Sequence, residues 1–119
     1  MTIRVIIMAI DISRSEGSSV DGTYKLHFCH PVAALKAYQR YWEKAITDTN
    51  VKLFKENSKF EVKDLEQVID ELNRLLVWAK ANLTGTDLGN MTWRLEQLLV
   101  AIPKSCEDTN AGDCPFEIY

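Results

Sequence analysis

Residues 63–83 read KDLEQVIDELNRLLVWAKANL and carry the clearest periodic pattern in the chain. Their apolar residues recur three and four positions apart, which is the spacing of one face of an α-helix. The stripe consists of Leu65, Val68, Ile69, Leu72, Leu75, Leu76, Ala79 and Leu83. Thr84 and Gly85 follow, and a glycine just past the last periodic residue is a typical C-terminal signal. The pattern therefore predicts an amphipathic helix over 63–83.

Two further helices are predicted on either side of it. Pro31 suits the first position of a helix, because its missing N–H has no partner there, and the periodicity after it predicts a helix over 31–47. The apolar residues of that helix are Leu35, Tyr38, Trp42, Ala45 and Ile46. A third helix is predicted over 91–102, after a loop at 86–90, and Pro103 is expected to end it. Its apolar residues are Met91, Leu95, Leu98, Leu99 and Ile102.

The remaining segments favour strands and loops. Residues 3–12 are rich in β-branched residues and apolar on both alternating faces, which predicts a strand covered on both sides. A polar, Gly/Ser-rich loop over 13–22 separates it from a half-buried strand at 24–29, so the two form an antiparallel hairpin. Residues 51–62 fit either a small hairpin or a connecting loop, and we favour a loop with some strand character. Residues 116–119 predict a short last strand.

These elements predict an α+β fold in the order β-β-α-α-α-β, with three helices packed on one side of a small, mainly antiparallel sheet. No internal repeat or composition break divides the chain, so residues 1–119 are expected to form one domain, with 104–114 as a polar loop or tail. The 119 residues are 46% hydrophobic and 26% charged, values typical of a globular domain that is large enough to bury one core.

Charge is unevenly distributed along the chain. The formal net charge is −3, but residues 1–60 hold 9 Lys and Arg against 6 Asp and Glu, whereas residues 61–119 hold 5 against 11. The acidic balance argues against a basic nucleic-acid-binding domain. Two interpretations remain open: a folded surface that intermixes the two halves, or an acidic surface that attracts a basic partner.

The N-terminal residues 1–12 lack the apolar region of about 7–15 residues and the small-residue cleavage site of a secretory signal. No stretch approaches the roughly 20 apolar residues of a membrane span. Three cysteines, an odd and low number, suit reduced thiols, so we expect a cytoplasmic protein that does not bind a membrane. Cys106 and Cys114 flank an acidic loop, and the sequence leaves open whether they form a disulfide.

His27, Cys29 and His30 are the only candidates for metal ligation. On a strand, His27 and Cys29 share a face, but a zinc site needs three or four converging ligands and the spacing matches no standard zinc pattern. We therefore expect Cys29 to pack as a small apolar residue, and we expect neither a metal nor a cofactor. Phosphate-binding glycine loops and nucleophile-elbow motifs are absent from the sequence, so no catalytic residue is assigned.

Two tryptophans lie off the apolar stripes of their helices. At about 100° per residue, Trp78 is about 140° from Leu65, and Trp93 is about 160° from Leu95. Either another element covers these side chains, or they are exposed as anchors for a partner protein. Acidic residues accompany Trp78 on its helix, and others lie in the tail. The predicted partner-binding residues are Glu66, Asp70, Glu71, Trp78, Glu107, Asp108 and Asp113.

In overall profile the chain resembles the small acidic cytoplasmic immunity proteins of bacterial toxin–immunity systems, including those of contact-dependent growth inhibition. The shared features are one compact α+β domain, no catalytic signature, an acidic half and candidate surface aromatics. The resemblance implies a protein that binds a cognate toxin, often a basic nuclease, and blocks its active site. Two alternatives are a small enzyme built around His27 or Cys29, and a homo-oligomeric protein that buries Trp78 or Trp93 in a symmetric contact. The sequence does not decide between monomer and dimer.

Overall fold

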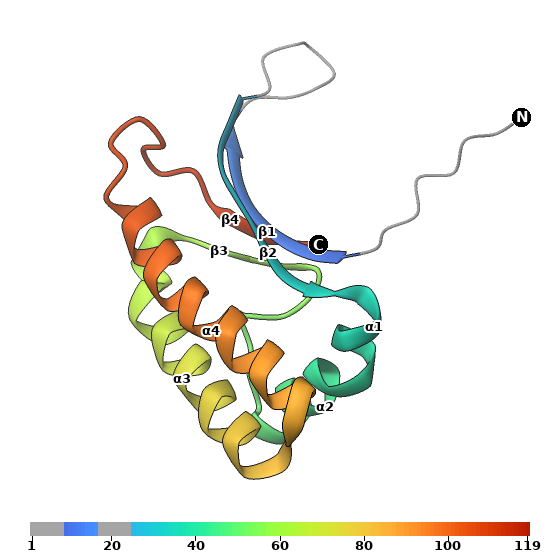
Figure 1. The fold of residues 1–119 in the computed structure, drawn as a ribbon. Coiled ribbons are helices and arrows are strands. Elements are labelled where there is room, and N and C mark those ends of the chain that lie inside the picture. Colours follow the sequence, from blue (N-terminus) through green and yellow to red (C-terminus); the bar gives the residue numbers. More distant parts are fainter. Residues whose placement is uncertain (1–8, 17–24) are drawn as a thin grey trace, which may run out of the picture.

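The computed structural model of this protein describes residues 9–16 and 25–119. Its strands are β1 (Ala9–Glu16), β2 (Lys25–Ala34), β3 (Ser58–Phe60) and β4 (Phe116–Ile118). They form one antiparallel sheet in the order β2-β1-β4-β3. β4 comes last in the sequence yet lies between β1 and β3, so segments that are far apart along the chain meet at the centre of the sheet (Figure 1).

The helices lie on one side of this sheet (Figure 1). In chain order they are α1 (Leu35–Ala37), a π-helical turn (Tyr38–Trp42), α2 (Glu43–Thr49), a 3-10 turn (Val62–Asp64), α3 (Leu65–Asn82) and α4 (Gly85–Cys106). The first three follow one another without a break and correspond to the first predicted helix. α3 and α4 pack side by side and run in opposite directions (Figure 1). The predicted α+β architecture is confirmed.

The core fills the space between the sheet and the helices. The inward-facing residues of the strands meet the apolar stripes that the sequence predicts for the helices, and the most buried members of both sets are almost inaccessible to solvent. They are Ile10, Ile12, Phe60, Val68, Leu72, Leu75, Leu95, Leu98, Ile102, Phe116 and Ile118. The rings of Phe60 and Phe116 stack with centroids 4.8 Å apart, which joins β3 to β4 through their side chains as well as their backbones.

The first hairpin is antiparallel, as predicted, but its strands have other bounds. β1 continues to Glu16, so the prediction that residues 13–16 belong to a loop is wrong. Residues 1–8, which include residues 3–8 of the predicted first strand, and residues 17–24 of the predicted loop and second strand lie outside the described part of the chain.

The prediction that Pro31 starts a helix is also wrong, because Pro31 lies within β2 opposite Asp11. The backbone N–H and C=O of Asp11 bond to Tyr119, at 2.8 and 3.0 Å, and so point away from β2. Pro31 therefore occupies a position of the ladder where β1 offers no hydrogen bond, and its missing N–H costs nothing. β2 is an edge strand with a register shift beside this position, and such sites are where strands accept proline.

Residues 51–62 form mainly a loop, as favoured from the sequence. The alternative hairpin within this segment is absent, because β3 pairs with β4 instead of with residues 51–55. The loop is held against α3 by hydrogen bonds from its backbone to the carboxylate of Glu71.

α4 is much longer than predicted. Residues 86–90 are helical and not a loop, and Gly85 begins α4 with φ +57° after Leu83 has ended α3. Asp87 in the first turn pairs with Arg40 at 3.2 Å, and an acidic residue is favourable at that end of a helix. Pro103 does not end α4, which continues to Cys106.

Arg14 explains why the helix continues and why the segment after it is ordered. This buried guanidinium donates to the backbone oxygens of Ser105 (2.6 Å), Gly112 (3.1 Å) and Cys114 (2.9 Å) and lies over the ring of Phe116. A cation is favourable at the C-terminal end of a helix, where carbonyl groups lack partners. The predicted polar tail over 104–114 is thus partly helix, and the rest is a loop attached to β1.

Candidate functional site

Glu71 is a buried structural residue, so its prediction as a partner-binding residue is wrong. Its side chain is 0% exposed, and its carboxylate accepts the backbone N–H groups of Lys52 (3.0 Å), Leu53 (3.1 Å) and Phe54 (2.8 Å). Three donors compensate for the loss of water around the charge. Helical periodicity places Glu71 off the apolar stripe correctly, but the 51–54 loop covers that side of α3.

Trp78 is also largely covered, which corrects its prediction as a partner-binding anchor and confirms the alternative that another helix packs on it. The residue is 8% exposed, and its indole N–H donates to Asp48 of α2 at 2.9 Å. This hydrogen bond, together with Lys44 nearby, lowers the pKa of Asp48 below its ordinary value. The nearby Arg74 donates to the backbone oxygen of Thr49, so α2 ends against α3 at this point.

The outward side of α3 is left exposed, and we call Glu66, Asp70, Asn73 and Val77 the α3 face. All four are exposed, at positions i, i+4, i+7 and i+11 of the helix. Val77 is a large apolar side chain that is 69% exposed. It borders an open depression of about 450 Å³ that is lined by Thr49, Asp70, Asn73, Arg74, Val77 and Trp78. Of the predicted residues, Asp70 and Trp78 thus line this depression, and Glu66 lies one helical turn before Asp70 on α3.

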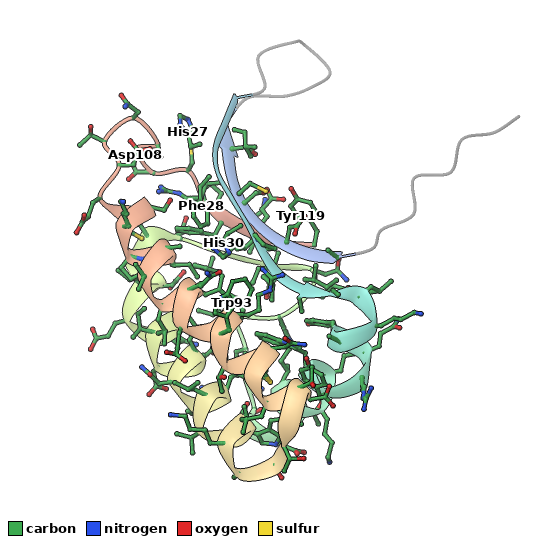
Figure 2. The ribbon with its side chains drawn as sticks, viewed as in Figure 1. His27, Phe28, His30, Trp93, Asp108 and Tyr119 are labelled. Carbon is green, nitrogen blue, oxygen red and sulfur yellow. The ribbon has the colours of Figure 1, made fainter. Side chains whose placement is uncertain are left out.

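The predicted acidic residues of the tail lie near the start of α3. Asp113 lines a small hollow of about 240 Å³ together with Glu61, Val62 and Lys63, which precede the helix. Glu107 is exposed, and Asp108 accepts the backbone N–H of Asn110 at 2.9 Å in the loop after α4, where Figure 2 shows it. The two acidic segments of the sequence therefore come together at one end of the molecule, although Lys63 pairs with Glu61 at 3.2 Å and offsets part of the charge.

His27, Cys29 and His30 do not form a metal centre. Within the described part of the chain, no three His, Cys, Asp or Glu side chains are placed to hold one ion. His30 contacts the oxygen of Pro31 through Nδ1 at 2.9 Å and stacks on Phe28.

Cys29 is exposed, so the expectation that it packs as a small apolar residue is wrong. Partial burial and the charge of Asp11 raise the pKa of its thiol. Cys106 and Cys114 are free cysteines in this structure.

A second exposed region lies where β2 borders α4, and we call Cys29, His30, Trp93, Glu96, Gln97 and Val100 the β2–α4 face. Trp93 is 52% exposed and Val100 69%. A groove of about 510 Å³ runs between them and is lined by His30, Thr92, Trp93, Glu96, Gln97 and Val100. Figure 2 shows Trp93 on the helix and His30 on the strand beside it. The guanidinium of Arg94 covers one side of the indole, 4.7 Å from its ring.

The sequence predicts the helical part of this face but not the part formed by the strand. Trp93 and Val100 lie two helical turns apart on the side opposite the buried stripe, so periodicity alone identifies them as a pair. That β2 is an edge strand follows from the strand order, which the sequence does not encode locally.

No protein-family model matches this chain, and no curated protein or solved structure matches it. Among the described residues, no helix combines the length and the apolar character needed to span a bilayer.

Proposed function

We propose that this chain is a protein-binding domain that neutralises a toxin, and that the α3 face is the surface that contacts it. The observation that carries the proposal is Val77, a large apolar side chain that is 69% exposed beside a depression of about 450 Å³. Contact surfaces of this kind combine an apolar centre with a polar, hydrogen-bonding rim. Asp70, Asn73 and Arg74 supply that rim.

The charge around the depression favours a basic partner. Glu66 makes no ion pair with the residues that the structure describes, and Asp70 is paired at 3.1 Å only with Arg74, which is itself half-buried. The exposed acids Glu107 and Asp113 extend the negative charge to the end of the molecule where α3 begins. Negative charge of this extent accelerates association with a basic protein and makes binding sensitive to salt.

The resemblance to small acidic immunity proteins supplies the finer part of the proposal. The partner is then a cognate bacterial toxin, and a basic nuclease fits the charge best. Acidic side chains of the α3 face occupy the positions of nucleic-acid phosphates, and the contact around Val77 excludes water from the interface. The protein works in the cytoplasm, where such a nuclease acts.

The test is co-expression of this chain with any toxin that proves to be encoded beside its gene, followed by a binding titration with the two purified proteins. We expect the wild-type chain to restore growth. Val77→Lys and the double variant Glu66→Lys/Asp70→Lys should each weaken binding at least tenfold, because each places positive charge against a basic surface. The double variant should also flatten the salt dependence of the affinity.

Val100→Lys is the matched control, because Val100 is as exposed as Val77 but lies on the β2–α4 face. Circular dichroism checks that all variants fold. A neighbouring toxin that the wild-type chain neither binds nor inhibits would end the immunity proposal. Loss of binding in Val100→Lys but not in Val77→Lys keeps immunity and moves its surface to the β2–α4 face.

A further inference from the structure

We propose that the β2–α4 face binds a second copy of this chain around a two-fold axis that passes beside Cys29 and between Glu96 and Gln97. The sheets of the two copies join edge to edge through β2, and the two α4 helices pack against each other in opposite directions. This inference concerns a surface separate from the α3 face and stands independently of the toxin proposal.

The strand β2 forms one edge of the sheet within the described residues. Asp11 bonds to Tyr119 on its other side, so the backbone of Pro31, its partner in β2, points to the free edge. Hydrogen-bonding directions alternate along an antiparallel ladder, so the N–H and C=O of Cys29 point to this edge as well. An unpaired strand edge of this kind is a ready template for another strand.

The register of such pairing is restricted by Pro31. A two-fold axis at Pro31 sets two prolines opposite each other, and neither has an N–H to donate. An axis at Cys29 sets two cysteines opposite each other, and each donates its N–H to the other's carbonyl oxygen. Of these two registers, pairing centred on Cys29 is the one that keeps the central hydrogen bonds.

The helix α4 carries two exposed apolar side chains on the same face. Trp93 and Val100 are separated by seven residues, about 10.5 Å along the helix, and both are exposed. An axis midway between them, between Glu96 and Gln97, places Trp93 of each copy on Val100 of the other. The same axis sets the carboxylate of Glu96 opposite the amide of Gln97 in the second copy. Glu96 has no ion pair with the described residues, so it is available for this contact.

The two elements share one centre, which is the strongest reason to choose a second copy as the occupant. His30, next to Cys29, lines the same groove as Trp93 and Val100, so the middle of the strand edge lies beside the middle of the exposed helix segment. An unrelated partner would not require the strand and the helix to be self-complementary around the same point. A symmetric dimer requires it.

The face is large enough for a stable dimer. A strand of ten residues and a helix of 22 residues are each about 33 Å long. A contact about 20 Å wide along the full length of both elements would cover on the order of 650 Å² for each copy, which is the upper bound for this face. Specific dimers bury about 600–1,000 Å² per partner, which is about a tenth of the 7442 Å² surface of this chain.

Sedimentation equilibrium of the purified full chain tests the proposal. We expect a dimer for the wild type and at least a tenfold weaker dimer for Val100→Asp, because a carboxylate then faces the indole of the other copy. Val77→Asp is the control with the same substitution at an equally exposed valine outside the face, and it should leave the dimer unchanged. Both variants should keep the wild-type circular dichroism spectrum.

Crosslinking tests the position of the axis. Cα atoms of a hydrogen-bonded pair lie about 5.5 Å apart, within the range that a disulfide spans. Diamide takes two electrons and two protons from the paired thiols, and we expect it to produce a covalent dimer through Cys29. The reaction is run at pH 9, because the thiol pKa of Cys29 is raised. Cys29→Ser should abolish the product, whereas the double variant Cys106→Ser/Cys114→Ser should retain it.

Two results would overturn the inference. One is a monomer at protein concentrations of several hundred micromolar. The other is a dimer that Val100→Asp does not weaken or that diamide does not link through Cys29, since this shows that another surface carries the contact. Neither result bears on binding of a toxin by the α3 face, because Val77→Lys tests that surface separately.

Discussion

Trp78 and Trp93 occupy equivalent places in the sequence pattern and opposite places in the structure. Each lies on the side of its helix away from the apolar stripe, but Trp78 is 8% exposed and Trp93 is 52% exposed. The difference lies in the neighbouring elements. The end of α2 packs on α3 and offers Asp48 to the indole N–H of Trp78, whereas Trp93 lies beside the edge strand of the sheet. An aromatic residue that lies off the apolar stripe of its helix can therefore be buried against another helix or exposed to solvent. Tertiary packing decides between the two.

Replacement of the two tryptophans should give the largest contrast. Trp78→Ala should lower the free energy of unfolding by about 3–5 kcal/mol, because a buried indole and its hydrogen bond are lost. Trp93→Ala should cost less than about 1 kcal/mol in the monomeric Val100→Asp background, because most of its surface already contacts water. Urea unfolding at low protein concentration measures both. Equal losses for the two variants would contradict the difference in burial.

The same contrast is expected for two acidic residues of α3. Glu71→Ala should cost about 3 kcal/mol, because it leaves three N–H groups of the 51–54 loop, one buried and two partly buried, without an acceptor. Glu66→Ala should change the stability by less than about 0.5 kcal/mol, since Glu66 is exposed. Chemical denaturation separates the two, and hydrogen exchange should show faster exchange at residues 52–54 only in Glu71→Ala.

The smallest effect should come from Asp48, whose carboxylate accepts the indole N–H of Trp78. Because the folded state lowers the pKa of this group, its stabilising contribution is complete above the ordinary pKa near 3.8 and is lost as the pH falls through the folded value. Asp48→Asn should therefore be less stable than the wild type at pH 6, and the difference should shrink below pH 3.5. Thermal unfolding of both proteins between pH 6 and pH 2.5 measures it, and a difference that stays constant over this range would exclude the role of the charge.

Periodicity predicted the parts of this fold whose burial depends on one face of one element. Most of the stripe from Leu65 to Ala79 lies in the core or packs against it, with Ile69 as the exception, and so does the stripe from Met91 to Ile102. The predictions of helix ends from single proline residues were less successful. Pro31 lies in a strand because β1 forms no hydrogen bond to it at that position. Pro103 lies in a helix that continues to Cys106, and Arg14 binds the backbone oxygen of Ser105 in its last turn.

The predicted site residues are divided into exposed and buried ones by tertiary contacts that helical periodicity does not predict. Glu66 and Asp70 are exposed because nothing among the described residues packs on that side of α3, whereas Glu71 and Trp78 meet the 51–54 loop and α2. Those contacts join positions 17 to 30 residues apart in the sequence, beyond the reach of any helical pattern. The groove beside Trp93 depends on the strand order, which involves residues still further apart.

The contacts of Arg14 have a consequence for synthesis of the chain. Arg14 and Cys114, whose oxygen it binds, are 100 residues apart, and β4 must enter between β1 and β3 before the sheet is complete. A ribosome that adds about 5–20 residues per second makes the last of these groups about 5–20 s after the first. During that interval the edge of β1 that pairs with β4 in the native sheet has no partner, and the guanidinium of Arg14 lacks its acceptors. The nascent protein therefore depends on β4 for protection against aggregation, and deletion of residues 116–119, which removes β4, should make the protein insoluble.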